Sequence, residues 1–425
     1  MSDAVNIPSL VDHFFRHESG KLMAVLTRVF GLSNLELVED VVQSALVQAL
    51  ETWKIQGVPE SPSAWIYRVA RNRALDVIRH REVVDRLGSE WAAIQRFGGE
   101  TPIDRLFLST EIADSQLRMI FTCCHPDLPE ESQIALTLKT LCGFSVGEIA
   151  HALLTTEANV KKRIARAKRK FADNTIGFEV PVGDSLKQRL DSVHTVIYLL
   201  FNEGYSSSQP QELIRRDVCG EAIRLGLLLF DHPACSDQDT AALLALMFLH
   251  AARFDARLDA EGRILLLKEQ DRKKWDQTLI SRGTYYLEES ARGDSVSRYQ
   301  LEAAIAAHHA LAPSFAETDW PVILMLYDHL IAVHPSPIHE LNRAIVKAQI
   351  SGPDAGIAAI EAIRELDALQ DYHLLHATLG ELHRRAGRYV KAAECFRAAI
   401  RCTESPSERE LLQRKLEATA VSKNG

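Results

Sequence analysis

Residues 145–171 read SVGEIAHALLTTEANVKKRIARAKRKF, and this stretch decides the fold of the region around it. Ser145 and Glu148 form an S-x-x-E capping box, which supplies partners for the free backbone N–H groups at a helix start. A turn at 154–155 follows, and Thr156 has the side chain of an N-cap for a second helix. The stretch therefore predicts two short helices joined by a tight turn, a helix–turn–helix.

The second of these helices has one apolar stripe and a strongly basic remainder. The stripe falls at positions i, i+4, i+7 and i+11 and consists of Val160, Ile164, Ala167 and Phe171. Seven lysines and arginines lie between 161 and 170, against the single carboxylate of Glu157. A solvated surface helix would carry such a charge run too, but the two caps and the turn favour insertion into a DNA major groove.

The composition is that of a globular protein with room for two or three domains in its 425 residues. Apolar residues make up 46% and charged residues 25%, and the formal net charge is −8. Because the chain as a whole is acidic, its surface is not built to coat nucleic acid. Basic character is confined to particular helices, which indicates contact at defined sites.

The seven cysteines are an odd number without a C-x-x-C pair, which is typical of a reducing cytoplasm. Cys123, Cys124 and His125 are adjacent, but neighbouring cysteines seldom close a tetrahedral site, so we expect no metal and no cofactor. The N-terminus lacks the pattern of a signal peptide. The longest apolar run, 241–249, is too short to span a bilayer. We therefore expect a cytoplasmic protein without membrane contact.

Three helices are predicted before residue 82, at 9–30, 35–53 and 64–81. The second carries only acidic charges before Lys54, which indicates either a solvated face or a docking face for a basic partner. The third carries five arginines against Asp76, next to Trp65 and Tyr67. Aromatic and basic side chains together hold phosphates and stack on unpaired bases. Both aromatic residues fit a protein core as well, and for Trp65 we expect the core.

Two ordered blocks of sequence then resemble one family. The first is Glu39-Asp40-Val41-Val42-Gln43 followed by Trp65-Ile66-Tyr67-Arg68-Val69-Ala70-Arg71-Asn72, Asp76 and Arg79. The second is Leu128-Pro129, Leu138, Gly143-Phe144-Ser145, Glu148-Ile149-Ala150 and Arg166-Ala167-Lys168-Arg169-Lys170. Over residues 9–172 the chain resembles the bacterial extracytoplasmic-function (ECF) sigma factors. It departs from their pattern at Gln133, Leu154 and Thr155, and with FTCCHPDLPE at 121–130 it resembles the subgroup with a long C-terminal extension.

The resemblance implies a division into four parts. These are sigma domain 2 at 1–81, a linker at 82–116, sigma domain 4 at 117–175 and a regulatory domain at 176–425. The implied partners are promoter DNA and core RNA polymerase, whose β′ clamp helices would receive Glu39, Asp40 and Gln43 and whose β flap would receive domain 4.

The resemblance also implies two sets of DNA contacts. The loop 56–63 would receive an unstacked base of the minus-ten element, and the implied contacts there are Ser61, Trp65, Tyr67, Arg68, Arg71, Asn72 and Arg79. Base edges of the minus-thirty-five element would meet Glu157, Ala158, Asn159, Lys161 and Lys162. Arg163 and Arg166 would meet phosphates, and Arg169 lies on the same DNA-binding helix.

Beyond residue 176 the pattern stays helical, so the predicted fold class is all-α throughout. The expected helices are 185–202, 210–230, 238–254, 273–291, 296–311, 320–333, 337–350, 354–366, 371–386, 389–402 and 406–420, with an extended piece near 263–268. Near the end, Leu379-Gly380, Gly387, Tyr389, Ala392, Phe396 and Ala399 resemble a tetratricopeptide (TPR) repeat. Gly352 precedes Gly387 by 35 residues, which indicates a second, weaker repeat. A TPR-like superhelix would offer a groove to an unknown protein or peptide.

Of the possible functions of residues 176–425, catalysis has the least support in the sequence. The segment 201–205, FNEGY, is more simply a turn between helices with Gly204 as C-cap, and the histidines at 308, 309, 329 and 334 lack metal-ligand spacing. We therefore predict a sigma factor, not an enzyme, with a regulatory domain in the same chain. The alternatives are a helix–turn–helix activator with a TPR-like sensor, and a scaffold or enzyme whose basic helix is incidental.

Overall fold

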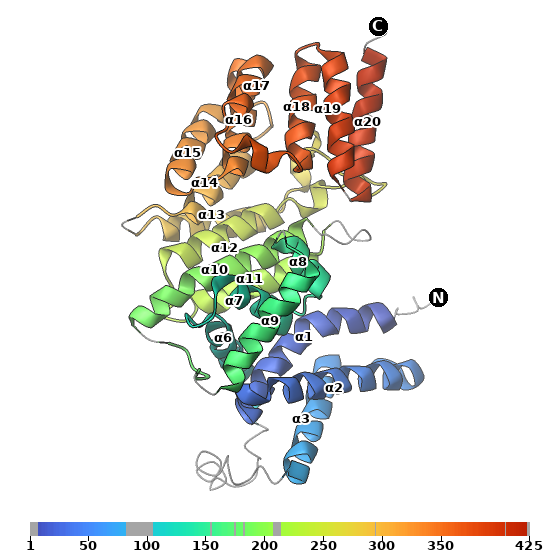
Figure 1. Cartoon of the computed structure of the whole chain (residues 1–425), viewed down its shortest axis with the longest axis vertical. Helices are drawn as coiled ribbons and strands as arrows, with labels where there is room; N and C mark the ends of the chain where they lie inside the picture. Colours follow the sequence, from blue (N-terminus) through green and yellow to red (C-terminus); the bar gives the residue numbers. More distant parts are fainter. Residues whose placement is uncertain are drawn as a thin grey trace. The chain divides into compact units, whose positions relative to one another are not determined.

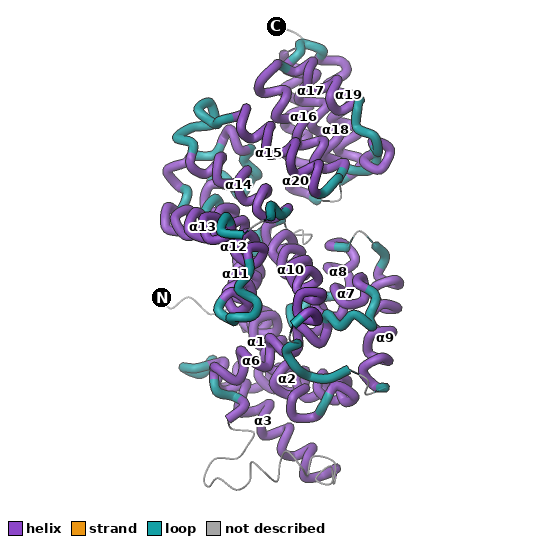
Figure 2. Tube along the Cα trace, turned by 90° about the vertical axis from the view of Figure 1, so that its left-hand side faces the viewer, coloured by secondary structure: helices purple, strands orange, loops and turns teal. Residues whose placement is uncertain are grey.

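The computed structural model describes residues 7–81, 105–153, 155–173, 176–181, 183–206, 214–293, 295–403 and 405–422. Within these ranges, side chains are described from Glu18 onward except at 78–81, 151–152, 188 and 421–422. Helices account for the regular structure of these residues, and one isolated bridge, between Leu258 and Ile264, is the only strand-like pairing among them (Figures 1 and 2). The expected all-α class is confirmed there. Residues 82–104, most of the predicted linker, lie outside the described part.

The chain divides into two compact units. The first comprises residues 1–203 together with 220–235, and the second comprises 204–219 together with 236–425. The predicted domain boundary after residue 175 does not coincide with this division, since the first unit continues into the C-terminal extension.

The first unit begins with three helices, α1 (Ile7–Phe30), α2 (Leu35–Gln56) and α3 (Pro62–Arg81). Gly31 ends α1 with φ of 80°, a left-handed conformation that suits glycine, and a short 3-10 helix at Leu32–Asn34 leads into α2. The buried side of α2 consists of Leu35, Val38, Val41, Val42, Ala45, Leu46, Ala49 and Trp53. Leu37 on the same helix is only half-buried.

Four more helices follow, α6 (Ser109–Cys123), α7 (Glu130–Thr140), α8 (Val146–Ala152) and α9 (Glu157–Ala172). Their core contains the fully buried rings of Phe121, Phe144 and Phe171. Cys123 and Cys124 are buried in it as well, and burial raises the pKa of the Cys123 thiol to about 12. These cysteines are therefore packing residues.

The helices α10 (Asp184–Tyr205) and α11 (Arg216–Phe230) open the extension. Helix α10 runs through Gly204, so the predicted C-cap there is wrong. A Cβ at Gly204 would come within 2.8 Å of the Cys219 backbone nitrogen, and the glycine instead allows close packing. Helix α11 begins at Arg216 and not near 210; residues 207–213 lie outside the described part.

Both helices also contact the first unit's earlier helices. A guanidinium nitrogen of Arg189 on α10 donates to the backbone oxygen of Phe121 at 3.1 Å. Arg224 on α11 donates to the Gln116 side chain on α6 at 3.0 Å and to its own neighbour Glu221 at 2.7 Å. The start of the extension thus packs on the helix that leads into the helix–turn–helix.

The second unit is a succession of helices, several of which form antiparallel pairs. They are α12 (Gln238–Ala251), α13 (Gln277–Ser290), α14 (Arg298–Leu311), α15 (Trp320–Val333), α16 (Pro337–Ser351), α17 (Pro353–Glu361), α18 (His373–Arg385), α19 (Tyr389–Cys402) and α20 (Pro406–Ser422). Short 3-10 helices lie at Phe254–Ala256, Leu267–Glu269, Arg272–Lys274 and Leu366–Leu369. The extended piece expected near 263–268 is present at Ile264, in the bridge with Leu258.

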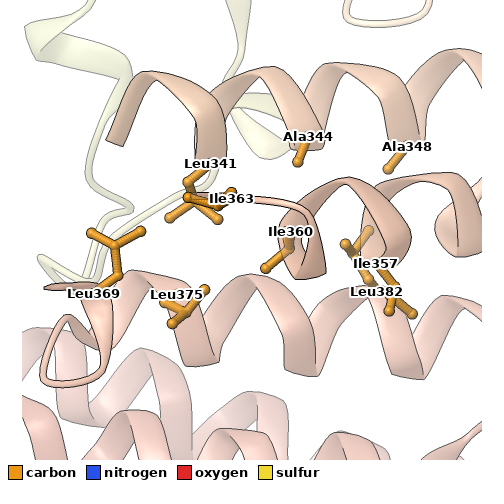
Figure 3. Close-up of a cluster of buried hydrophobic side chains, with 9 residues drawn as sticks. All are labelled: Leu341, Ala344, Ala348, Ile357, Ile360, Ile363, Leu369, Leu375 and Leu382. Atoms are coloured by element: carbon orange, nitrogen blue, oxygen red, sulfur yellow. The ribbon is translucent and has the colours of Figure 1, made fainter. Parts of the chain in front are cut away.

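Two helix pairs correspond to the repeat signature. Gly352 separates α16 from α17 with φ of 88°, and Gly387 precedes α19 with φ of 74°. Gly380 lies against the ring of Phe396, where a Cβ would approach to 2.8 Å. Figure 3 shows the apolar cluster that joins α16, α17 and α18, in which Leu341 lies beside Ile363 and Leu382 lies beside Ile357. Neither pair buries its apolar face alone, so they stack.

Candidate nucleic-acid and polymerase interfaces

The helix–turn–helix is fixed by the two predicted caps. The backbone N–H of Ser145 donates to the Glu148 carboxylate at 2.7 Å, and the N–H of Glu148 donates to the Ser145 hydroxyl at 3.2 Å. The Thr156 hydroxyl accepts from the backbone N–H of Asn159 at 3.3 Å. These bonds satisfy the free donors at the starts of α8 and α9, so both helices begin where the sequence predicts.

Helix α9 buries its predicted stripe and exposes its basic side. Val160, Ala167 and Phe171 are at most 1% exposed, and Ile164 is half-buried. Seven of the eight residues predicted to contact the minus-thirty-five element are exposed: Glu157, Ala158, Asn159, Lys161, Lys162, Arg166 and Arg169. The helix thus exposes a cationic surface, while the apolar stripe on its other side packs into the protein.

Arg163 is the exception among the predicted contacts. Its guanidinium lies 2.6 Å from the Glu131 carboxylate on α7, and its side chain is only 19% exposed. Lys161 is more loosely paired with Glu157 on its own helix, at 3.6 Å, and both side chains are well exposed. Arg163 therefore ties α9 to α7 in this structure, while Lys162 and Arg166 remain exposed.

The acidic side of α2 forms a second surface. Asp40 and Gln43, two of the three predicted docking residues, are exposed. Glu39 is half-buried, because its carboxylate lies 2.7 Å from the ammonium of Lys168 on α9. Farther along the same helix Val47 is 47% and Ile55 86% exposed, which leaves apolar surface beside the acidic groups.

The third surface lies on α3 and just before it. Ser61, Arg68 and Asn72 are exposed, and Arg71 lies half-buried with a guanidinium nitrogen 3.2 Å from the Asn72 side-chain oxygen. The side chain of Arg79 lies outside the described part of the chain. Polar and basic groups are therefore accessible along one stretch of α3.

The two aromatic residues of α3 are less accessible than DNA stacking requires. Trp65 is half-buried and meets the ring of Trp53 edge-on, with centroids 5.5 Å apart. The Tyr67 hydroxyl donates a short hydrogen bond to Glu18 on α1, and its ring lies 5.9 Å from that of Phe107. Burial and the neighbouring Glu18 carboxylate raise the pKa of Tyr67 above its usual value. In this structure both rings pack between helices, which agrees with the core reading of Trp65.

Comparison with known proteins finds family matches for the two segments that carry these surfaces. Residues 14–83, which include α2 and α3, match Sigma-70 region 2, and residues 118–171, which include α7 to α9, match Sigma-70 region 4. The chain therefore contains regions 2 and 4 of sigma-70 factors, which support a role as a sigma factor. Its partners are core RNA polymerase and promoter DNA, and its function is promoter-specific transcription.

The other matches are less informative. Residues 189–291 match a family of unknown function (DUF6596). An uncharacterized protein of Rhizobium meliloti (strain 1021) is 37% identical over 400 residues, which cover 94% of this chain and 93% of that protein. No solved structure matches the chain. In the part that the structure describes, no helix is both long and apolar enough to cross a membrane.

The second unit contains two neighbouring open cavities of about 580 and 380 Å³. Both are lined by Leu266, Ile345, Gln349, Glu381 and Arg385. The larger one adds an aromatic wall made of His309, Phe315, Trp320 and Tyr327. The walls of these cavities are therefore partly apolar and partly charged.

Glu381 is the charged centre of these cavities. Its carboxylate lies 2.8 Å from Arg384, 3.2 Å from Lys415 and 3.5 Å from Lys268. Burial alone would raise the pKa of Glu381, but the hydrogen bond from Arg384 and the charges of the two lysines lower it to about 2. This carboxylate therefore stays ionised and joins three helical segments.

Sequence reasoning missed the partners of several site residues. The basic run revealed Lys168 but not its ion pair with Glu39, 129 positions away. Gly20 gave no signal, although a Cβ there would lie 1.8 Å from the backbone oxygen of Leu141. A helix-interior glycine is a weak sign of close packing, and only the structure shows what packs there.

Proposed function

We propose that this protein is an ECF-type sigma factor whose TPR-like C-terminal extension regulates it within the same chain. The observation that carries the proposal is helix α9, which exposes a basic face on a doubly capped helix–turn–helix. It does so in a chain that also has region 2. A protein with both regions is expected to bind promoter DNA and core polymerase, whereas region 4 alone would also be compatible with a helix–turn–helix activator that binds DNA only.

Polymerase docking would use the acidic side of α2. Asp40 and Gln43 are exposed there, and Glu39 would join them when it is free of Lys168. Carboxylates in this arrangement complement the basic clamp helices of the β′ subunit. The helices of region 4 would contact the β flap.

Promoter recognition would use two helices. The exposed N-terminal residues of α9, Glu157 to Lys162, would meet base edges of the minus-thirty-five element, and Arg166 and Arg169 would meet phosphates. Ser61, Arg68, Arg71, Asn72 and Arg79 would hold the opened minus-ten strand. Trp65 and Tyr67 would join them only if α3 moves relative to α1, since both rings are packed between helices.

The extension would act on the sigma regions through its first helices. Arg189 and Arg224 contact α6, so a change in α10 or α11 reaches the helix that precedes region 4's helix–turn–helix. The concavity around Glu381 would receive the protein or peptide whose binding sets the state of the extension.

Run-off transcription with purified core polymerase tests the proposal. Three forms are compared on genomic fragments that include the gene's own upstream region: the full chain, residues 1–235 and residues 1–175. Specific transcripts from the full chain or from 1–235 establish sigma activity, and the ratio of the two assigns the second unit as inhibitor or required partner. The 1–175 form loses α10 and α11, and we expect it to be poorly stable.

A single exposed charge tests the docking surface. Asp40→Lys should weaken binding to core polymerase by about tenfold, because it puts a like charge against basic clamp helices. Asp173→Lys, an equal charge reversal at an exposed residue just after α9, is the control and should bind core normally. If Asp40→Lys binds core as tightly as wild type, the docking assignment fails. DNA binding by the chain without any affinity for core would instead support a helix–turn–helix activator.

A further inference from the structure

The two open cavities of the second unit form one groove, because they share five of their lining residues. Helices α16, α18 and α20 each contribute a pair of lining residues four positions apart, a spacing that puts both on one side of a helix. The pairs are Ile345 and Gln349, Glu381 and Arg385, and Leu411 and Lys415. The groove therefore crosses these three helices, and we call it the cross-helix groove.

Cationic side chains outnumber carboxylates in the cross-helix groove. Its lysines and arginines are Arg257, Lys268, Arg385 and Lys415, against the carboxylates of Glu381 and Glu408. The charge of Glu381 is already compensated, because Lys268 and Lys415 lie 3.5 and 3.2 Å from its carboxylate. The groove thus keeps positive charge in a chain whose formal net charge is −8.

The two arginines of the groove have no carboxylate partner among the described residues. Arg385 is exposed, and its guanidinium donates to the backbone oxygen of Ala348 at 3.0 Å. The guanidinium of Arg257 donates a short hydrogen bond to the backbone oxygen of Tyr205 and lies 3.8 Å from the centre of the Tyr205 ring. A backbone oxygen leaves the charge of a guanidinium uncompensated, and each guanidinium keeps further N–H donors for an anion.

Two further arginines lie close to Arg257 and add to the positive potential. Burial and the charge of Arg253 lower the pKa of both Arg257 and Arg272. In the part of the chain that the structure describes, Arg253 and Arg272 pair with no carboxylate, and both guanidinium groups lie over the Trp275 ring. Burial and the charges of Arg253 and Arg272 also lower the pKa of His309, in the groove wall, to about 4. His309 is therefore neutral near pH 7, and an anion at this wall would meet only positive charge.

The rest of the groove is largely apolar, which distinguishes among anionic ligands. Phe315, Trp320 and Tyr327 line its larger cavity, and Leu374 on α18 lines its smaller cavity and is 44% exposed. A nucleic acid strand carries one charge per nucleotide and needs a row of basic side chains along it. A peptide can instead place carboxylates beside two arginines and apolar side chains against the walls between them. The groove therefore fits a peptide better than a nucleic acid.

We propose that the cross-helix groove binds an extended acidic peptide, whose carboxylates pair with Arg257 and Arg385 and whose apolar side chains pack on Leu374 and the aromatic wall. This rests on the proposed function, because the peptide is the partner assigned there to the extension. It adds the chemistry of that partner, a linear segment that combines Asp or Glu with large apolar residues. A guanidinium and a carboxylate form two parallel hydrogen bonds, so the contact supplies direction as well as charge.

Peptide selection on the full chain tests the proposal. A phage-displayed library of short random peptides is selected on the immobilised protein, and the most enriched peptide is labelled with fluorescein for anisotropy. We expect acidic residues beside large apolar ones, and an affinity that falls as the KCl concentration rises. Replacement of every carboxylate side chain of that peptide by its amide should weaken binding at least about tenfold, because hydrogen bonds between charged groups are lost.

Two variants of the protein place the peptide in the groove. Arg385→Gln should weaken its binding about tenfold and Leu374→Ala about threefold or more, since one removes a charged partner and the other apolar contact area. Arg397→Gln is the matched control and should bind the peptide as wild type does. Arg397 is exposed on α19, lines neither cavity and forms no ion pair with a described residue. Circular dichroism verifies that each variant folds, and if one fails this check, the other carries the test.

Several results would overturn the proposal: a library that yields no binder, enrichment of basic or purely apolar peptides, or equal affinities of Arg385→Gln and wild type. A labelled single-stranded oligonucleotide that binds more tightly than the peptide and loses affinity in Arg385→Gln would assign the groove to nucleic acid instead. Run-off transcription at saturating peptide separates this proposal from the proposed function. If the peptide binds the groove as expected but the transcripts do not change, the groove assignment stands and regulation by the extension fails.

Discussion

Two arginines three residues apart on α9 should respond differently to the same substitution. Arg166 is exposed, and none of the described residues forms an ion pair with it. Arg163 is only 19% exposed and pairs with Glu131 at 2.6 Å. We predict that Arg166→Gln removes a phosphate contact of the holoenzyme, whereas Arg163→Gln leaves phosphate contacts nearly unchanged.

The magnitude follows from counterion release. Each phosphate contact contributes about 0.9 to the slope of log K against log salt concentration, so Arg166→Gln should make that slope shallower by about 0.9. Between 50 and 200 mM salt, one such contact changes relative affinity about 3.5-fold. Arg163→Gln should give the same slope as wild type within experimental error. It should lower the free energy of unfolding by about 0.2–1 kcal/mol, the usual contribution of an ion pair with one exposed partner.

The assay is fluorescence anisotropy of holoenzyme on a labelled duplex that contains the minus-thirty-five element, repeated over a series of KCl concentrations. Affinity for core polymerase, measured separately, should be equal for both variants and wild type. The reasoning is refuted if Arg166→Gln leaves the salt slope unchanged, or if Arg163→Gln lowers it as much.

Three further predictions concern stability and are checked by denaturant unfolding of the full chain. Ser145→Ala removes one half of the capping box of α8 and should cost about 1 kcal/mol, whereas Ser145→Thr, which keeps the hydroxyl, should cost little. Phe396→Ala leaves a cavity at the fully buried site beside Gly380 and should lower the free energy of unfolding of the second unit by about 3–5 kcal/mol. If the first unit lost as much stability, the two units would not unfold independently. Since the folded pKa of Glu381 is about 2, below its ordinary value of 4.5, its contribution is present above pH 4.5 and is lost as the pH falls toward 2. Glu381→Gln should therefore lower the free energy of unfolding by up to about 3 kcal/mol at pH 7, and this difference from wild type should vanish near pH 2.

Local signals in the sequence predicted most of the helices and their ends. The capping pair at Ser145 and Glu148 and the N-cap at Thr156 involve residues three apart, and both are present. The apolar stripe of α9 was predicted for the same reason, because helical periodicity repeats within a few residues. The errors arose where packing overrides a local rule: Gly204 resembles a helix end, yet α10 continues through it because Cys219 packs there.

The sequence alone could not predict which residues from different helices form ion pairs or hydrogen bonds with each other. Lys168 and Arg163 both belong to the basic run, and nothing in their neighbourhood distinguishes them from Lys162 or Arg166. The structure separates them, since Lys168 meets Glu39 on α2 and Arg163 meets Glu131 on α7. Tyr67 is a similar case, because its motif suggests a DNA contact while its hydroxyl is bound to Glu18.

The sequence by itself determined that this protein is helical, that it carries a capped helix–turn–helix with a basic helix, and that region 2 precedes it. These properties depend on residue type and on spacing over a few turns of helix, which a linear sequence records directly. Only the tertiary structure decided which charges remain exposed and that α10 and α11 belong with the sigma regions. It also decided that region 4 contacts α1 at Gly20 and α2 through the ion pair of Lys168 with Glu39. Those outcomes depend on contacts between different helices, up to 129 residues apart in the sequence, whose geometry exists only once the chain has folded.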